Sequence, residues 1–215
     1  MGWTSFHATF YNKNNDVDRK AECDNYFNNK WYRLEKSVIK GSTYYAAVTP
    51  LFRSNFNYNE EGWEPIPESE QKTVAFIILT YVNCKEYHNF SYKIMDETAG
   101  PYYYDCPESI LKLLSPTDNE FATKWRENCR IKNHTIKEKQ RLAKLPYGAK
   151  IEVLMPCDAG MFHTGDKVVL TKIKQLRPGY KNVKTRWVAN CVAFSASLMQ
   201  EIIDNDAYII LENTD

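Results

Sequence analysis

Val74-Ala75-Phe76-Ile77-Ile78-Leu79-Thr80-Tyr81-Val82 is the most apolar stretch of this chain, and it decides the fold of the N-terminal half. The stretch is rich in β-branched and aromatic residues, and both of its alternating faces are apolar. A strand of this kind is buried on both sides, so we expect it to lie at the centre of a sheet. Tyr87–Ile94 follows after a short polar turn and should pair with it.

Upstream of this stretch, the sequence predicts further strands and one helix. Residues 1–10 alternate in polarity, which is typical of a strand, and Trp31–Ile39 with Ser42–Thr49 predict a hairpin. Asp16 or Asp18 can cap a short helix that ends near Phe27.

The acidic segment Ser54–Lys72 contains two prolines and few strand signals, so we expect a surface loop or insertion there.

Helical signals follow from residue 105 onward. Asp105 can cap a helix over Pro107–Leu114, and Thr117 with Glu120 forms a capping box that opens a longer amphipathic helix. The apolar positions of that helix fall on one predicted stripe, which would leave its Lys and Arg towards solvent: Phe121, Trp125, Cys129, Ile136 and Ala143.

The residue pattern changes from helical to strand-like at Pro146-Tyr147-Gly148, after which short predicted strands alternate with turns up to residue 211. Ser197 and Gln200 offer a second capping box before the last strand. We therefore predict an α+β fold, with an N-terminal mixed or antiparallel sheet domain that carries helices and a small C-terminal SH3-like β-barrel. The predicted boundaries are 1–117 for the α+β domain, 118–145 for a connecting amphipathic helix and 146–215 for the barrel.

Charge is distributed unevenly along the chain. The whole protein carries +1, yet residues 124–186 hold sixteen Lys/Arg against five Asp/Glu. Aromatic residues such as Tyr147 and Tyr180 lie in or beside this basic block, and cations interleaved with rings are typical of nucleic-acid grooves. A solvated helix face and loops, offset by the acidic N-terminal domain, would account for the block equally well. The candidate binding residues in the block are Lys124, Arg126, Arg130, Lys172, Lys174, Arg177, Lys184 and Arg186.

Residues 89–109 form the densest polar and aromatic segment. Asp96, Glu97 and Asp105 are candidate metal or general-base carboxylates, and Cys106 at a helix start is a candidate nucleophile. Capping and turn formation explain the same residues without catalysis, and we favour that interpretation because spacing assigns no base or oxyanion donor.

Other site classes are disfavoured. The six cysteines and four histidines lack the close-spaced pairs of a structural zinc site, and no phosphate loop, dinucleotide turn or nucleophile elbow is present. We expect no metal and no cofactor. The start of the sequence shows no secretory pattern, and the longest apolar stretch is far too short to span a bilayer, so we expect a cytoplasmic protein that does not bind membranes.

The segment Tyr92-Lys93-Ile94-Met95-Asp96-Glu97-Thr98-Ala99-Gly100-Pro101-Tyr102-Tyr103-Tyr104-Asp105-Cys106-Pro107, together with Trp125-Arg126, resembles an uncharacterised family encoded by bacteriophages and other mobile elements of gut and Gram-positive bacteria. Its motif is YKxMDExxGPxYYDCP followed by WR, and the resemblance covers roughly residues 1–135. This chain has Ser91 and Ile94 where the family often has Gly and Asp, so one carboxylate is missing. The resemblance implies a phage or plasmid origin, and it carries no activity over to this chain.

We therefore expect a non-enzymatic mobile-element accessory protein that binds and inhibits a host macromolecule in the host cytoplasm. The expected partner is a host protein or nucleoprotein complex, such as a defence complex, or its nucleic acid. Two alternatives remain open. One is a hydrolase or transferase acting on nucleotides or nucleic acid at the Asp-Glu and Asp-Cys motif. The other is a nucleotide-signal sponge built on Tyr102, Tyr103 and nearby cations.

Overall fold

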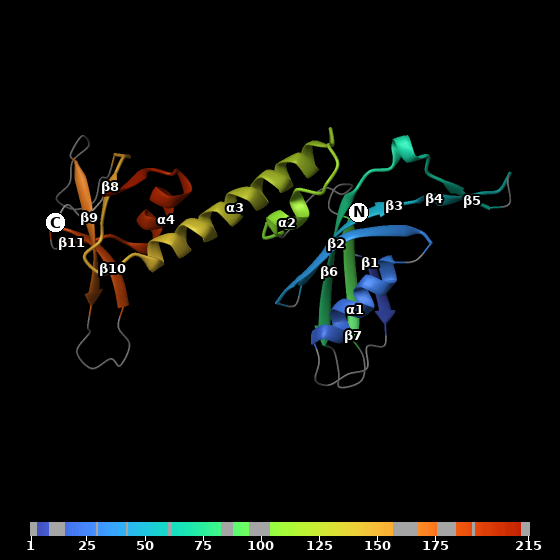
Figure 1. Cartoon of the computed structure of the whole chain (residues 1–215), viewed down its shortest axis with the longest axis horizontal. Helices are drawn as coiled ribbons and strands as arrows, with labels where there is room; N and C mark the ends of the chain where they lie inside the picture. The colour runs from blue at the N-terminus through green and yellow to red at the C-terminus, as the bar shows by residue number, and fades with distance from the viewer. Residues whose placement is uncertain are drawn as a thin grey trace. The chain divides into compact units, whose positions relative to one another are not determined.

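The structure is a computed structural model, and it describes residues 4–8, 16–28, 30–41, 43–59, 62–82, 88–94, 104–156, 167–175, 184–190 and 192–211. The chain divides into two compact units, Met1–Asn133 and His134–Asp215. Both units combine helices with antiparallel sheet (Figure 1), so the chain is α+β. The boundary falls inside helix α3 (Glu120–Lys144), which corresponds to the connecting helix expected over 118–145.

The first unit is built on a five-stranded sheet in the order β1-β7-β6-β3-β2, with every neighbouring pair antiparallel. The apolar stretch Val74–Val82 forms β6, which lies at the centre of the sheet as predicted. Gly41, in the turn between β2 and β3, has φ +62°, a conformation that favours glycine. The strands are β1 (Thr4–Ala8), β2 (Tyr32–Lys40), β3 (Thr43–Pro50), β6 (Val74–Val82) and β7 (His88–Ile94).

Helices cover both faces of this sheet. Because side chains alternate along a strand, Tyr44 and Tyr45 of β3 point to opposite faces. Tyr44 packs in a cluster with Phe27 of α1 (Asp16–Phe27). Tyr45 packs in a second cluster that includes Trp125 of α3 and residues of α2 (Glu108–Leu111). Burial on both sides explains why β3 is buried from residue 43 to residue 49.

The acidic segment predicted as a loop is partly a hairpin, so that prediction is wrong. It contains β4 (Phe52–Asn57), β5 (Gly62–Pro65) and a 3-10 turn η1 (Glu68–Glu70). Phe56 lies opposite Trp63 in the antiparallel pair, so cross-strand aromatic packing stabilises a hairpin that the acidic composition concealed.

The second unit is a five-stranded antiparallel sheet in the order β11-β10-β9-β8-β12. One face packs against the C-terminal half of α3 and against α4 (Ala196–Asp204), around a cluster that includes Leu142, Trp187 and Ile202. Within the described residues, no pairing joins the edge strands β11 and β12, so the sheet is open there. The strands are β8 (Lys150–Val153), β9 (Val168–Gln175), β10 (Lys184–Ala189), β11 (Val192–Ala193) and β12 (Tyr208–Leu211).

Two details of the helices correct the sequence expectations. Asn119 caps α3, because its side chain accepts a hydrogen bond from the Ala122 N–H at 3.0 Å, and the predicted Thr117 capping box does not form. Ser195, two residues before the predicted cap, caps α4 by accepting from the Leu198 N–H at 3.1 Å.

Helix α3 does not bury one continuous apolar stripe. Phe121, which the predicted stripe includes, is 55% exposed, and Ala143 is also exposed. The two halves of the helix belong to two units, and each half buries its own set of positions with helical spacing. The prediction of a single apolar stripe is therefore wrong. The buried positions are Ala122, Trp125, Arg126 and Cys129 in the first half, and Thr135, Glu138 and Leu142 in the second.

Candidate functional site

Asp105, a candidate catalytic carboxylate and helix cap, does not cap α2. The residue that precedes α2 is Pro107, with no side-chain cap, so the capping prediction is wrong. Asp105 instead accepts a hydrogen bond from the hydroxyl of Tyr45 on β3. Its second carboxylate oxygen lies 3.8 Å from the Lys40 ammonium, and its backbone carbonyl accepts from the same ammonium at 3.2 Å. Both contacts tie the segment before α2 to the sheet.

Cys106, the candidate nucleophile, is fully buried in the core of the first unit. Its backbone carbonyl accepts a hydrogen bond from the Asn133 side chain of α3 at 2.7 Å. Cys129 belongs to the same cluster, where burial raises the pKa of its thiol to about 12. Reactive cysteines need a stabilised thiolate and solvent access, and both of these thiols are fully buried.

Several candidates lie outside the described residues: Asp96, Glu97, Tyr102, Tyr103 and Arg177. Among the residues that the structure does describe, no group of three His, Cys, Asp or Glu is placed to hold a metal ion. In that same part of the chain, no helix is long and apolar enough to cross a membrane.

The basic block separates into buried and exposed cations. Arg126, which is 8% exposed, donates to the Ser115 carbonyl at 2.7 Å within the first unit. Lys172 is 4% exposed and donates to three carbonyls at the C-terminal end of α3, at 3.1, 2.8 and 2.6 Å. A cation there satisfies the orphan carbonyls and the negative end of the helix dipole. The expectation that these two side chains face solvent is therefore wrong, and we remove them from the candidate surface.

The exposed cations of the block are divided between the two units. Lys124 and Arg130 are exposed on the part of α3 that belongs to the first unit, where Arg130 lies 4.0 Å from Glu127. Lys174 and Lys184 are exposed and Arg186 is half-buried in the second unit. These last three lie at the same end of the β9–β10 pair.

This end of the sheet is built by strand register and by the end of α3. Lys174 lies opposite Thr185, and Lys184 lies opposite Gln175, so the cations project from both faces of the sheet. The Tyr147 hydroxyl lies 3.4 Å from the Thr185 hydroxyl, which brings the segment after α3 to the same place. We call this surface the basic sheet end and define it by Lys144, Tyr147, Lys174, Lys184 and Arg186.

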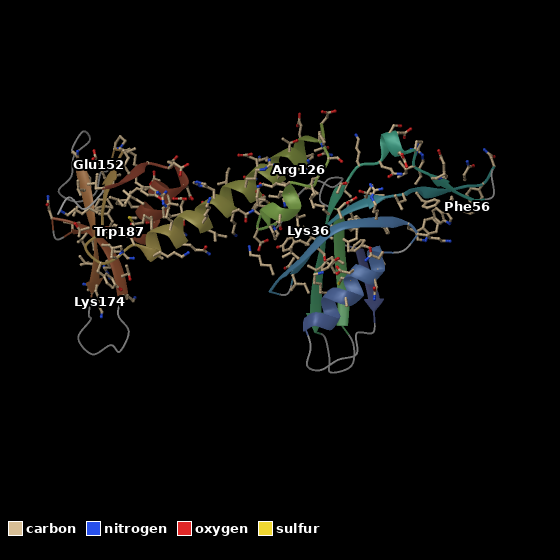
Figure 2. All side chains as sticks on the ribbon, in the orientation of Figure 1. Lys36, Phe56, Arg126, Glu152, Lys174 and Trp187 are labelled. Carbon is tan, nitrogen blue, oxygen red and sulfur yellow. The ribbon has the colours of Figure 1, made fainter. Side chains whose placement is uncertain are left out.

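The three lysines of the basic sheet end are exposed. Within the described residues, Lys144, Lys174 and Lys184 have no ion-pair partner. Glu152, towards the other end of the sheet (Figure 2), is paired with Lys167 at 2.9 Å. Lys144 was not among the residues predicted from the sequence. It lies two positions after Leu142, at the end of the predicted helix, and this position could have indicated it.

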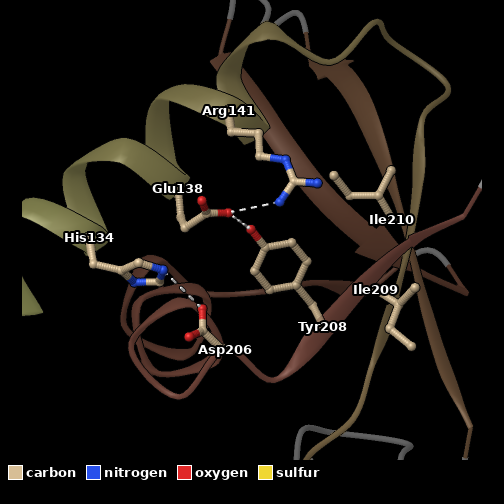
Figure 3. Close-up of a pocket in the computed structure, with 7 residues that line it drawn as sticks. All are labelled: His134, Glu138, Arg141, Asp206, Tyr208, Ile209 and Ile210. Atoms are coloured by element: carbon tan, nitrogen blue, oxygen red, sulfur yellow. Dashed lines mark hydrogen bonds and ion pairs between the residues drawn. The ribbon is translucent and has the colours of Figure 1, made fainter.

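A hollow of about 380 Å³ lies in the second unit between α3 and β12 (Figure 3). The Tyr208 hydroxyl donates to Glu138 at 2.5 Å, and Arg141 donates to the same carboxylate oxygen at 3.3 Å. These hydrogen bonds outweigh burial and lower the pKa of Glu138, while burial and the carboxylate raise the pKa of Tyr208. His134 and Asp206 form a second pair, 3.5 Å apart. Because these side chains pair with each other, we interpret them as contacts that hold α3 to β12 and to Asp206, two residues before it. We call this set the latch: His134, Glu138, Arg141, Asp206 and Tyr208.

Comparisons with known proteins found no relative: no family model, no curated protein and no solved structure matches this chain.

Proposed function

We propose that this protein acts by binding, and that its basic sheet end occupies a polyanionic host macromolecule, either nucleic acid or a nucleoprotein complex. The observation that carries the proposal is that Lys174 and Lys184 lie at the same end of the β9–β10 pair, one on each face, and that they and Lys144 are exposed and, within the described residues, without a carboxylate partner. Unpaired cations attract phosphates and release their counterions, which supplies sequence-independent affinity. Tyr147, 54% exposed beside them, offers a ring on which a base can stack.

The biological setting that we propose rests on the resemblance of residues 92–107 and Trp125-Arg126 to phage and mobile-element proteins. Such a protein would inhibit a host process in the bacterial cytoplasm, for example a defence complex, by occupying its target. We also propose that the second unit is an SH3-like barrel. The pairing of β12 with β8 supports this, because it brings the last strand beside the first strand of the unit.

Among the candidate residues that the structure describes, the geometry gives the enzymatic alternative no specific support. Of its candidate residues, Asp105 is engaged by Tyr45 and Lys40, and Cys106 has no exposed surface. Both residues are explained by packing in the first unit.

The proposal is tested by fluorescence anisotropy with a labelled single-stranded oligonucleotide and a labelled duplex at increasing NaCl concentration. We expect affinity to fall steeply with salt, because each neutralised phosphate contributes a slope of about −0.9 in log K against log salt. The double variant Lys174→Glu/Lys184→Glu should bind at least about tenfold more weakly, with a slope reduced by about 2.

The matched control is Lys36→Glu/Lys112→Glu, which reverses two exposed charges in the first unit and should leave affinity within about twofold, because neither residue belongs to the basic sheet end. Absence of binding at low salt would overturn the proposal, as would equal binding by the two double variants.

A further inference from the structure

Five aromatic side chains form a continuous row on the β4–β5 hairpin and the residue beside it. Neighbouring rings meet edge to face, with centroids 4.9 Å apart for Trp31 and Trp63, 5.7 Å for Trp63 and Phe56, and 5.4 Å for Phe56 and Tyr58. None of the five belongs to either buried cluster found in the described part of the first unit. We call this set the aromatic row: Phe52, Trp31, Trp63, Phe56 and Tyr58.

Exposure increases towards the hairpin tip. Trp31 and Phe52 are half-buried, whereas Phe56 is 39%, Trp63 43% and Tyr58 86% exposed. Phe56 lies on the part of the hairpin that reaches beyond the five-stranded sheet (Figure 2). Contiguous exposed rings of this kind are typical of interaction surfaces, because a fold alone gains little from leaving them in water.

The other face of the hairpin holds the row in place. Arg53 alternates with Phe52, so it projects to the opposite face, where its guanidinium lies 2.9 Å from Glu64 and 2.8 Å from Glu70. This pair of contacts ties β4 to β5 and to η1. A two-stranded hairpin is marginal by itself, so the clamp and the ring pairs together keep the row ordered before any partner arrives.

Charge decides which partner fits. The segment from Phe52 to Lys72 contains five glutamates against two basic residues, so an anionic nucleic acid is repelled here. The ammonium of Lys30 already lies 5.1 Å from the centre of the Trp31 ring. A ring face presents its negative quadrupole to such a cation, and arginine is the side chain that most often occupies this position.

We propose that the aromatic row is a docking surface for an arginine-rich segment of a partner protein. The guanidinium groups lie over the exposed rings of Trp63, Phe56 and Tyr58, and the surplus of glutamates in the segment from Phe52 to Lys72 supplies the complementary charge. This surface belongs to the first unit and selects a cation, so it is independent of the basic sheet end. The protein then has two binding surfaces of opposite preference, which suits the recognition of a nucleoprotein complex.

The test is fluorescence anisotropy with a labelled peptide of four Gly-Arg repeats and with the same peptide carrying neutral citrulline. We expect the arginine peptide to bind and the citrulline peptide to bind at least tenfold more weakly. Tyr58→Ala and Trp63→Ala should each weaken binding of the arginine peptide at least fivefold. Phe121→Ala removes a ring of similar exposure from the same unit and should leave binding unchanged.

Circular dichroism establishes that each variant is folded, and Tyr58→Ala decides alone if Trp63→Ala does not fold, because Tyr58 is 86% exposed. Equal binding of both peptides, or no effect of Tyr58→Ala, would overturn the proposal. Self-association that Tyr58→Ala abolishes in sedimentation velocity would also overturn it, because a second copy would then be the occupant. Lys174→Glu/Lys184→Glu should retain peptide binding, so this surface and the basic sheet end fail separately.

Discussion

Tyr45 donates its hydroxyl to Asp105 and thereby ties β3 to the segment that leads into α2. Its neighbour Tyr44 points to the other face of the sheet and donates to Asp24 of α1 at 2.7 Å. Burial, reinforced by the carboxylate acceptor, raises the pKa of both tyrosine hydroxyls. Adjacent residues of one strand thus hold the segments on both faces of the sheet through the same chemistry, and Asp105 needs no catalytic role to account for it.

Loss of the acceptor should destabilise the first unit. Asp105→Ala leaves the Tyr45 hydroxyl buried without its partner, which should lower the free energy of unfolding by about 1–3 kcal/mol. Asp105→Asn keeps an acceptor oxygen and should cost clearly less. In a double-mutant cycle with Tyr45→Phe, the double variant should lose less than the sum of the singles. Urea unfolding measures the four proteins of the cycle and Asp105→Asn, with the exposed Asp118→Ala as control. If the free-energy losses of the two single variants add up to the loss of the double variant, the hydrogen bond between Tyr45 and Asp105 is contradicted.

Lys172→Met should destabilise the second unit much more than Lys174→Met. The first substitution leaves three carbonyls at the end of α3 without their cation, which should cost about 3 kcal/mol, whereas an exposed surface change typically costs less than about 0.5 kcal/mol. Hydrogen exchange read on peptides of α3 and β9 measures the difference. Oligonucleotide binding should show the reverse order, with only Lys174→Met weakening it. If Lys172→Met weakens oligonucleotide binding more than Lys174→Met does, the prediction is wrong and Lys172 lies at the ligand.

Periodicity predicted the parts of the fold that depend on local pattern. The β2–β3 hairpin, β6 and its pairing with β7 follow from strand-forming residues with clear alternation. The β4–β5 hairpin was missed because the predicted segment Ser54–Lys72 holds five glutamates and only three rings, although Phe56 and Trp63 lie opposite each other in the strand pair. The burial of α3 was missed because one helix serves two units, which no single period can reveal.

The site was harder to predict because burial depends on partners that are distant in sequence. Arg126 donates to the carbonyl of Ser115, eleven residues away in sequence, and Lys172 donates to the carbonyl of Leu142, thirty residues away. Asp105 bonds to a residue sixty positions upstream. A charge count treats all such residues as exposed, so it located the basic block but could not separate cations that stabilise the fold from those that face solvent.

Three buried thiols should be unreactive in the folded protein. Cys106 and Cys129 have no exposed surface and Cys23 only 2%, and a buried thiol forms little thiolate. Iodoacetamide labelling near pH 8, located by peptide mass spectrometry, should modify these three at least about 100-fold more slowly than in concentrated urea, because each requires local opening. Rapid native labelling of Cys106 in a folded sample would instead restore it as a candidate nucleophile.

Glu138 should make the second unit lose stability in acid. Its pKa in the folded protein lies below the ordinary value, first because Tyr208 donates to it and then because Arg141 does. A lowered folded pKa stabilises the protein above the unfolded pKa of about 4.3, and this contribution disappears as pH falls through the folded value. Glu138→Gln keeps an acceptor but no charge, so it should cost about 1–2 kcal/mol at pH 7 and progressively less below about pH 4.

The measurement is urea unfolding of both proteins at several values between about pH 7 and pH 3, with hydrogen exchange on β12 peptides to assign the change to the second unit. Glu201→Gln is the matched control, because Glu201 is an exposed glutamate of the same unit and, among the described residues, its side chain has no hydrogen bond or ion pair. Its free energy of unfolding should follow the parent protein at every pH. If the cost of Glu138→Gln stays constant across this range, the charge of Glu138 does not hold the latch, and packing of the Tyr208 ring against α3 must account for it.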